Sequence, residues 1–251
     1  MATDRMSVSA ARGEVPEAFD EVADRYDLMV ALNPGYHAHL RRSARDLVAS
    51  LPDGQTVRIL DLGCGSGAST RALVHELGRA GLRAEVLGID GSAGMLAQAG
   101  RKRWPEWVRF EQGRAESLER VCDNAGFDCP DAVFAAYLLR NVSDREGLLR
   151  SLYRLIAPGG TLVIQEYSVA GRPVSQAVWT AVCHGIVMPL GWLTSRQTRL
   201  YRYLWRSVMD MESLEAVMER MVEAGFEDVR TRSVRGWQRG IIHTFHGRRP
   251  A

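Results

Sequence analysis

Seven residues at the end of an apolar run have the types and spacing of a ligand-binding loop. Asp61-Leu62-Gly63-Cys64-Gly65-Ser66-Gly67 follows a predicted strand, Val57–Leu62, and precedes a predicted helix, Ser69–Arg79. Its three glycines let the backbone turn sharply from strand to helix and let a ligand approach the backbone closely. The loop therefore predicts a nucleotide-like cofactor site at the end of this strand.

Two carboxylates near the loop discriminate between cofactors. Asp61 would repel the pyrophosphate of a dinucleotide but attract the ammonium and sulfonium of S-adenosylmethionine. Asp90, at the end of the next predicted strand, can accept hydrogen bonds from both ribose hydroxyls of either cofactor. Gly63, Gly65 and Ala68 also satisfy the G-x-G-x-x-A dinucleotide pattern, so a nicotinamide oxidoreductase stays an alternative. A tight turn without a ligand is the remaining alternative, and the charge of Asp61 favours S-adenosylmethionine.

A second group of candidates follows the predicted strand Ala132–Ala136. Arg140 would lie at the sheet edge where ligands bind, and its fixed cation is suited to stabilise a phenolate on an aromatic acceptor. Asn141 would orient the same oxygen, and with Tyr201 these two form the predicted catalytic set. The alternative for Arg140 is a surface salt bridge. Its partner would be Asp144 or Glu146, and other candidates for hydrogen bonds to a ring hydroxyl are Tyr26, Tyr203, Glu166 and His184.

Strands and helices alternate through the middle of the chain. This order predicts right-handed crossovers and an α/β fold with a doubly wound, mostly parallel, Rossmann-like sheet, a C-terminal antiparallel hairpin and a helical insertion. Further predicted strands are 85–90, 108–111, 132–136, 161–166, 226–234 and 241–245, and further predicted helices are 17–32, 36–51, 92–101, 145–156 and 211–224.

The sequence predicts one domain over residues 1–251. Its parts are an N-terminal helical lid (1–55), a cofactor-binding core (56–170), a helical substrate-side insertion (171–209) and a C-terminal helix and hairpin (210–251). The insertion carries Trp179, Trp192 and Trp205, which suit either an apolar substrate pocket or a dimer contact.

The composition is that of an ordinary globular protein. Of 251 residues, 46% are hydrophobic and 25% charged, with a net charge of +2, which excludes disordered, collagen-like and disulfide-scaffold classes and gives little support to nucleic-acid binding. The longest apolar run is eight residues, against the ~20 of a spanning helix. Without a secretory signal in its first eighteen residues, the chain is predicted to be cytoplasmic. The four cysteines form no C-x-x-C pair, so no metal site is predicted.

The motifs resemble those of class I S-adenosylmethionine-dependent methyltransferases. The resemblance rests on Ile59–Gly67, Asp90 and Ala157-Pro158-Gly159-Gly160 before a strand. Narrower motifs resemble the ubiquinone/menaquinone C-methyltransferase family, namely Val22–Met29, Leu139–Asp144, Tyr201–Leu204 and Ala224–Glu227. The cofactor-binding residues that the resemblance implies are Tyr26, Asp61, Gly63, Cys64, Gly65, Gly67, Asp90, Gly91, Met95, Arg114 and Ala115.

The chain also departs from that narrower family. Its loop Gly63–Ala68 replaces the usual Gly-Gly-Thr-Gly-Asp, Arg114 stands where an Asp or Asn usually faces the adenine, and Leu118–Asp131 is longer than expected. We expect methyl transfer to a ring carbon of a quinol-like or other aromatic small molecule. The alternatives are a secondary-metabolite acceptor at carbon, oxygen or nitrogen, and a cyclase or sensor that binds S-adenosylmethionine without transfer. Peripheral membrane contact and a homodimer are left open.

Overall fold

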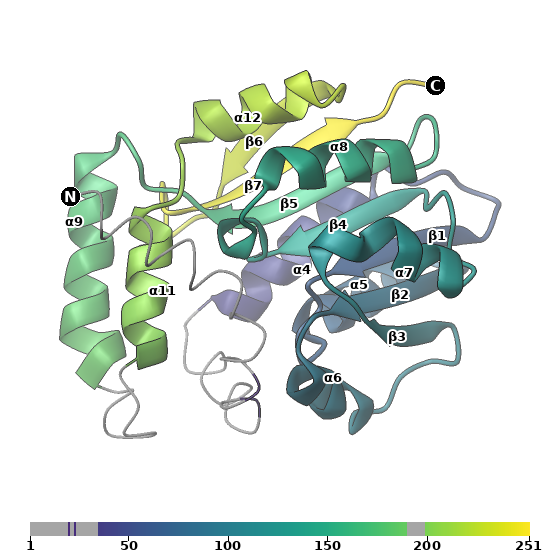
Figure 1. The fold of residues 1–251 in the computed structure, drawn as a ribbon, viewed down its shortest axis with the longest axis horizontal. Helices are drawn as coiled ribbons and strands as arrows, with labels where there is room; N and C mark the ends of the chain where they lie inside the picture. Colours follow the sequence, from purple (N-terminus) through teal and green to yellow (C-terminus); the bar gives the residue numbers. More distant parts are fainter. Residues whose placement is uncertain (1–19, 21–22, 24–34, 190–198) are drawn as a thin grey trace.

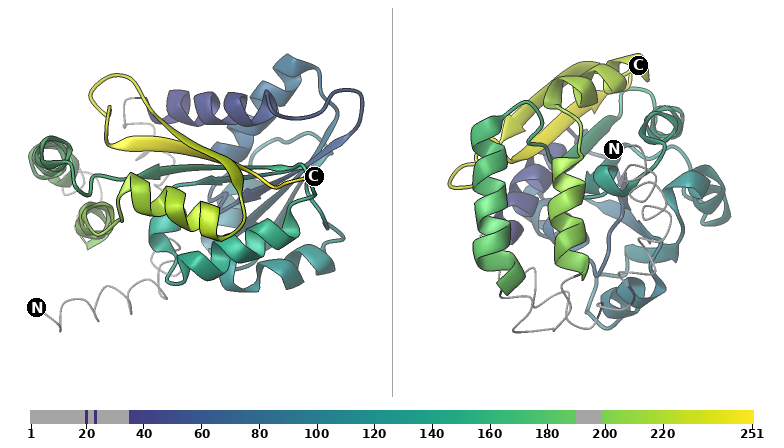
Figure 2. Two further views of the ribbon diagram at one scale, coloured as in Figure 1. Left: turned by 90° about the horizontal axis from the view of Figure 1, so that it is seen from above. Right: turned by 60° about the vertical axis from the view of Figure 1, so that its left-hand side comes forward.

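A seven-stranded sheet with helices on both faces forms the centre of the molecule (Figures 1 and 2). The computed structural model describes residues 20, 23, 35–189 and 199–251. The strand order is β3-β2-β1-β4-β5-β7-β6; β1 to β5 run parallel, and β7 runs antiparallel to both β5 and β6. The strands are β1 Val57–Leu62, β2 Ala84–Asp90, β3 Val108–Gln112, β4 Ala132–Ala136, β5 Thr161–Tyr167, β6 Glu227–Ser233 and β7 Ile242–Arg248.

The helices fill the crossovers between the strands. The longer ones are α4 Tyr36–Val48, α5 Ala68–Ala80, α6 Ala93–Gly100, α7 Leu118–Asn124, α8 Arg145–Leu155, α9 Pro173–Val182, α11 Arg199–Met209 and α12 Leu214–Glu223. Single turns are η1 Ala115–Ser117 and η2 Leu139–Asn141, and the π-helical turn η3 Cys183–Val187 continues α9. No helix in these described ranges has the length and hydropathy to cross a bilayer.

Each face of the sheet has its own apolar core, because side chains alternate along a strand. On β1, Ile59 packs into the cluster with α4 and α5, whereas Leu60 packs into the cluster with α7, α8 and α12. Leu47 and Leu149, one from each cluster, are fully buried. A strand covered on both faces reads as a continuous apolar run, which is why the parallel strands could be predicted from the sequence.

The structure confirms the predicted fold class, including the C-terminal antiparallel pair. The region 118–131 was predicted only as a long connection, and the structure adds α7 as the crossover helix there. Strand β7 extends three residues beyond the predicted end at Phe245. The predicted helix 17–32 lies outside the described residues, apart from Asp20 and Ala23.

The segment after β5 leaves the sheet as a pair of helices. In Figure 1, α9 and α11 stand side by side at the left-hand end of the sheet, and Figure 2 shows them end-on in its left panel. Trp179 of α9 is buried, and Trp205 of α11 donates from Nε1 to Thr180 Oγ1 at 3.2 Å. Trp205 therefore packs between the two helices, whereas Trp179 contacts Tyr167 of β5, with 5.1 Å between ring centroids. Trp192 lies outside the described residues.

Candidate cofactor and acceptor site

A cavity opens at the carboxyl ends of β1, β2 and β4, where a parallel sheet reverses its strand order and binds ligands. The glycine loop forms one wall, and the residues after β2, β3 and β4 form the others. Ten predicted site residues line it, namely Gly63, Cys64, Gly65, Asp90, Gly91, Met95, Arg114, Ala115, Arg140 and Asn141. Asp61, Gly67 and Tyr201 do not line it, and Tyr26 lies outside the described residues.

The glycine loop has a backbone that only glycine adopts without strain. Gly63, Gly65 and Gly67 have φ angles of 73°, 54° and 88°. A Cβ built on Gly67 would lie 2.7 Å from the ring of Trp104, so this glycine is needed for both conformation and space. Gly67 is the N-cap of α5, so it fixes the path of the loop without lining the cavity itself.

Asp90 is held at the cavity wall by two backbone amides. Its Oδ2 accepts from the N–H of Gly65 at 2.8 Å, and its Oδ1 accepts from the N–H of Ser92 at 2.9 Å. Burial raises the pKa of Asp90, and these hydrogen bonds oppose the shift. Because each carboxylate oxygen has a second lone pair, Asp90 keeps the capacity to accept from ligand hydroxyls. This geometry fits a ribose.

Asp61 lies behind the loop. The side chain is fully buried, and its Oδ2 accepts from Ser69 Oγ at 2.8 Å and from Thr70 Oγ1 at 2.5 Å. Its Oδ1 has no hydrogen-bond partner among the described residues. Burial raises the pKa of Asp61 to about 7, although the two hydroxyls lower it. A buried carboxylate behind Leu62 and Gly63, which do line the cavity, fits a cationic ligand through its charge.

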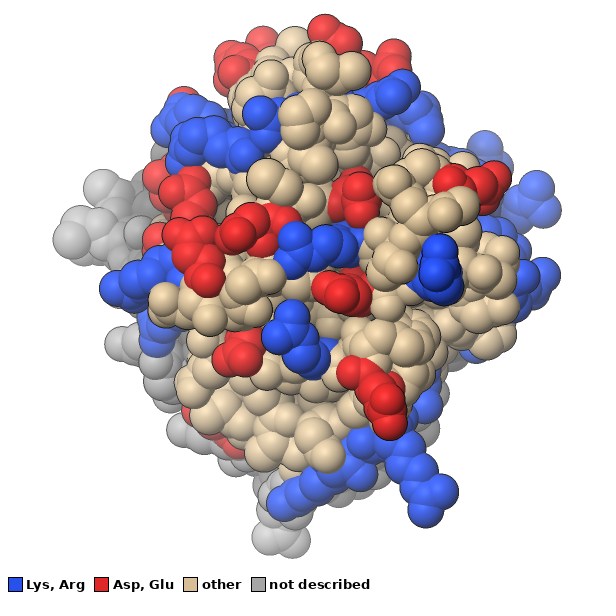
Figure 3. Space-filling view, turned by 90° about the vertical axis from the view of Figure 1, so that its right-hand side faces the viewer, with Lys and Arg blue, Asp and Glu red and all other residues tan. Residues whose placement is uncertain are grey.

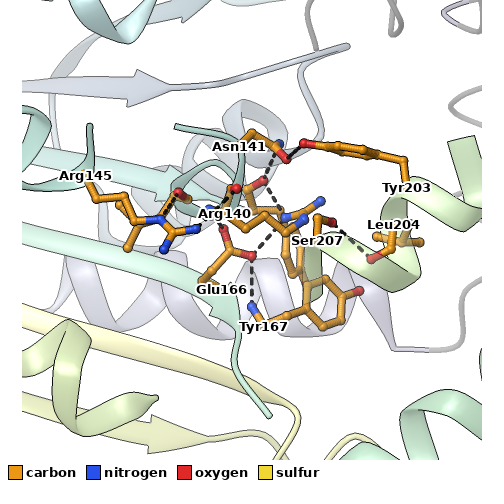
Figure 4. Close-up of polar contacts among 10 residues, drawn as sticks. Arg140, Asn141, Arg145, Glu166, Tyr167, Tyr203, Leu204 and Ser207 are labelled. Atoms are coloured by element: carbon orange, nitrogen blue, oxygen red, sulfur yellow. Dashed lines mark hydrogen bonds and ion pairs between the residues drawn. The ribbon is translucent and has the colours of Figure 1, made fainter. Parts of the chain in front are cut away.

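Arg140 forms a buried ion pair with Glu166 of β5 (Figure 4). Its Nη1 donates to Glu166 Oε1 at 2.9 Å and to the carbonyl of Tyr137 at 2.6 Å, and its backbone N–H donates to Glu166 Oε2 at 3.1 Å. Burial lowers the pKa of Arg140, but Glu166 together with Tyr167 and Tyr203 more than offsets this effect, so the pKa lies above its ordinary value. The Nε–H of Arg140 has no hydrogen-bond partner among the described residues. The alternative of a surface salt bridge to Asp144 or Glu146 is wrong, since the partner is Glu166.

Asn141 links the strand end to α11. Its Nδ2 donates to the carbonyl of Tyr137 at 3.3 Å, and its Oδ1 accepts from the hydroxyl of Tyr203 at 3.1 Å (Figure 4). Tyr203, rather than Tyr201, therefore joins this network. Tyr201 is buried elsewhere, and His184 is exposed on the outer helix, where it contacts Thr180.

A row of aromatic rings extends from the cavity. Tyr36 stacks on Tyr137 with 5.3 Å between ring centroids, Tyr137 contacts Tyr167 at 5.0 Å, and Tyr167 contacts Trp179 at 5.1 Å. The Arg140 guanidinium lies over Tyr137 and Tyr167, at 5.9 and 5.5 Å from the ring centroids. Tyr36 and Tyr137 line the cavity and were not predicted. The position of Tyr137 directly after a buried strand was the signal that could have identified it.

Known proteins of one family resemble this chain along almost its whole length. The model of the ubiE/COQ5 methyltransferase family matches residues 5–248. The ubiquinone/menaquinone biosynthesis C-methyltransferase UbiE of Ectopseudomonas mendocina is 33% identical over 94% of this chain and 89% of its own length. The enzyme of the same name from Legionella pneumophila strain Philadelphia 1 is 34% identical over 91% of this chain and 88% of its own length.

Solved structures share the fold at low sequence identity. The plantazolicin methyltransferase BamL has a TM-score of 0.67 and 12% identity, covering 98% of this chain and 99% of its own. A Haloferax volcanii complex of a methyltransferase activator with its methyltransferase has a TM-score of 0.61 and 19% identity, covering 93% of this chain and 98% of its own. These likenesses confirm the architecture.

Proposed function

Because the chain belongs to the ubiE/COQ5 methyltransferase family and is therefore an S-adenosylmethionine-dependent methyltransferase, we propose that its acceptor is a ring carbon of a quinol-like aromatic molecule. Two relatives with about a third of their residues identical are named for methylation at carbon in quinone biosynthesis. The observation that carries the proposal is Arg140, a buried cation in the cavity wall beside aromatic rings.

The residues around the glycine loop fit the cofactor. When bound, S-adenosylmethionine supplies an electrophilic methyl group on its sulfonium. Asp90 would accept from the ribose hydroxyls, and Asp61 would attract the cationic end of the molecule from behind the loop. Arg114 and Ala115, after β3, would lie along the adenine.

The acceptor chemistry assigns a role to Arg140. A ring carbon ortho to a hydroxyl becomes nucleophilic as the hydroxyl ionises, but a free phenol has a pKa of about 10. Arg140 lies in the cavity wall and keeps its charge although it is buried, so a phenolate oxygen beside its guanidinium would be stabilised by that charge. Transfer would form the new carbon–carbon bond as the carbon–sulfur bond of the sulfonium breaks and S-adenosylhomocysteine leaves. The ring carbon would then lose its hydrogen as a proton.

Glu166 and Asn141 act as positioning residues in this proposal. Glu166 fixes both the side chain and the backbone of Arg140, and Asn141 connects the same turn to Tyr203. Tyr36 and Tyr137 supply an apolar wall against which a flat ring can pack. The enzyme would thus accelerate transfer by orientation and by electrostatic stabilisation of the anion.

The direct test is to incubate the protein with S-adenosylmethionine and a set of reduced quinones. We expect S-adenosylhomocysteine and a product in which NMR places the new methyl on a ring carbon. Methyl on oxygen or nitrogen would instead support a secondary-metabolite acceptor. Product formed without S-adenosylhomocysteine would indicate a cyclase, and binding of S-adenosylmethionine without any product from the acceptor set would contradict the proposed acceptor class.

A further inference from the structure

The outer side of α9 and η3 exposes apolar side chains. Val174, Val178 and Ile186 are 78%, 36% and 59% exposed, and they account for three of the five large hydrophobic residues exposed in the described parts of the chain. Their spacing of four and eight residues places them along one side of the helix. We call this surface the α9 face. Contiguous apolar surface of this kind marks a site of association.

The chain around the α9 face has an unusual charge pattern. From Tyr167 to Met209 the sequence contains no Asp or Glu, so all 30 acidic residues lie outside this segment. The opposite side of the molecule, by contrast, shows both signs interspersed (Figure 3). The segment's five cations are Arg172, Arg196, Arg199, Arg202 and Arg206.

Three arginines of this segment lie at the surface. Arg172 is exposed at the N-terminal end of α9. Arg202 and Arg206 are exposed on the neighbouring helix α11, four residues apart and therefore on one side of it. Figure 2 shows the two helices packed alongside each other at one end of the molecule. An uncharged apolar helix thus stands beside a helix that carries exposed cations.

A loop between β6 and β7 extends this surface. Gly240 lies against the first turn of α9, so close that a Cβ built on it would be 3.0 Å from Ser175 Oγ. In the same loop Trp237 is 41% exposed, and its neighbours Arg235 and Arg239 are exposed as well. Tryptophan flanked by arginine is the combination that favours the headgroup region of a bilayer.

We propose that the α9 face and the Trp237 loop dock on the surface of a bilayer that contains anionic lipids. Apolar side chains with surrounding arginines match the two components of such a surface, the acyl boundary and the negative headgroups. A second copy of this chain matches it less well. A symmetric dimer would bring the same arginines toward each other, and this segment supplies no carboxylate to pair with them.

The proposed surface is connected to the cavity through α11. Tyr203 of α11 donates a hydrogen bond to Asn141, which lines the cavity, so α11 connects the proposed surface to the cavity wall. An acceptor with an apolar chain could then reach the site from the lipid. The docking itself goes beyond the proposed methyl transfer, and vesicle binding is measured without any acceptor.

The test is flotation of the full chain with two kinds of vesicle, phosphatidylcholine alone and equal parts of phosphatidylcholine and phosphatidylglycerol. We expect binding to the mixed vesicles that is at least tenfold stronger than to the neutral ones and that weakens with salt. The double variant Val174→Asp/Ile186→Asp should bind at least tenfold more weakly. Val222→Asp is the matched control, because Val222 of α12 is as exposed as Ile186, at 59%.

Folding of each variant is checked by its thermal unfolding and by its affinity for S-adenosylhomocysteine, which should match the wild type. Equal binding to both kinds of vesicle, or equal losses in the α9-face variant and the Val222 control, would overturn the proposal. So would a dimer in solution that dissociates in Val174→Asp/Ile186→Asp while the wild type ignores vesicles, since the α9 face would then belong to a second copy.

Discussion

Arg140 and Glu166 illustrate how far the sequence leads at the scale of single residues. Arg140 could be placed at the site because it follows a buried strand, where ligands bind in parallel sheets. Its partner could not be identified, because Glu166 is 26 residues away on the next strand and reads as part of an apolar run. Tyr203 and Tyr201 could not be distinguished for a different reason, because the sequence alone does not show which neighbour each side chain faces. Two tyrosines on one helix differ only in the direction of their side chains.

Removing Arg140 should separate stability from catalysis. Arg140→Ala leaves Glu166 charged, buried and unpaired, so we expect a loss of about 3 kcal/mol in the free energy of unfolding, together with a large loss of turnover. The double variant Arg140→Ala/Glu166→Gln removes the unpaired charge and should recover part of the stability. Denaturant unfolding and initial rates measure both effects. Recovery of turnover in the double variant would exclude Arg140 as the stabilising cation.

Asp61 should make cofactor affinity depend on pH. Its pKa is raised from 3.8 to about 7, so folding favours the protonated form. The stability that this group contributes is therefore complete below about pH 4 and is lost as the pH rises through about 7. Ionised Asp61 attracts the ligand ammonium, so affinity for S-adenosylhomocysteine should increase from about pH 6 to about pH 8. Calorimetry on Asp61→Asn should show a flat profile, and a slope equal to that of the wild type would contradict this role.

The two tyrosines of α11 should differ in effect. Tyr203→Phe removes the hydroxyl that donates to Asn141, so we expect a several-fold loss in kcat/KM for the acceptor with unchanged affinity for S-adenosylhomocysteine. Tyr201→Phe is the matched control on the same helix, because the hydroxyl that donates to Asn141 belongs to Tyr203. Steady-state kinetics decides between them. A larger effect at Tyr201 would favour Tyr201 over Tyr203 as the tyrosine that contributes to catalysis.

At the scale of elements, the buried strands could be predicted from the sequence, but the short crossover helix α7 could not. Strands β1, β4 and β5 are buried along almost their whole length, so their positions follow from the apolar runs, and Gly63 marks the end of β1. Helix α7 has seven residues, of which Leu118 and Cys122 are buried, and so short a pattern does not identify a helix. The cavity forms from the ends of several such elements. The sequence predicts that the glycine loop lines the cavity, but it does not predict that α4 reaches the same cavity through Tyr36.

The geometry of the glycine loop predicts how much stability the protein loses when Gly67 is replaced. Gly67→Ala forces an alanine to a φ of 88° and places its Cβ against Trp104, whereas Gly54, at a φ of 83°, has open space around it. Gly54→Ala should therefore cost only the left-handed strain of about 1 to 2 kcal/mol. Gly67→Ala should cost more and should also weaken S-adenosylhomocysteine binding. Urea unfolding of the two variants compares their free energies of unfolding. Equal losses in the two variants would show that the structure around Trp104 relaxes at little energetic cost.

At the scale of the whole molecule, the cofactor should act as a stabilising ligand. S-adenosylhomocysteine at about 100 times its Kd should add about 2.7 kcal/mol to the free energy of unfolding. For a domain of this size each kcal/mol raises Tm by roughly 2 to 4 °C, so the expected rise is about 5 to 10 °C. NADH serves as the control, because Asp61 should oppose a dinucleotide. Thermal unfolding with NADH that matches the shift from S-adenosylhomocysteine would revive the oxidoreductase alternative.

The strand order also constrains how the chain assembles during synthesis. Strand β7 lies between β5 and β6, although β6 precedes it in the sequence. A growing chain can pair β1 to β5 early, but β6 finds its place only after β7 has left the ribosome. Until residue 248 emerges, β5 is an open edge, and the exposed edge of an apolar sheet is where misassembly begins. During synthesis the ribosome therefore exposes a five-stranded sheet whose edge at β5 stays open until β7 has emerged.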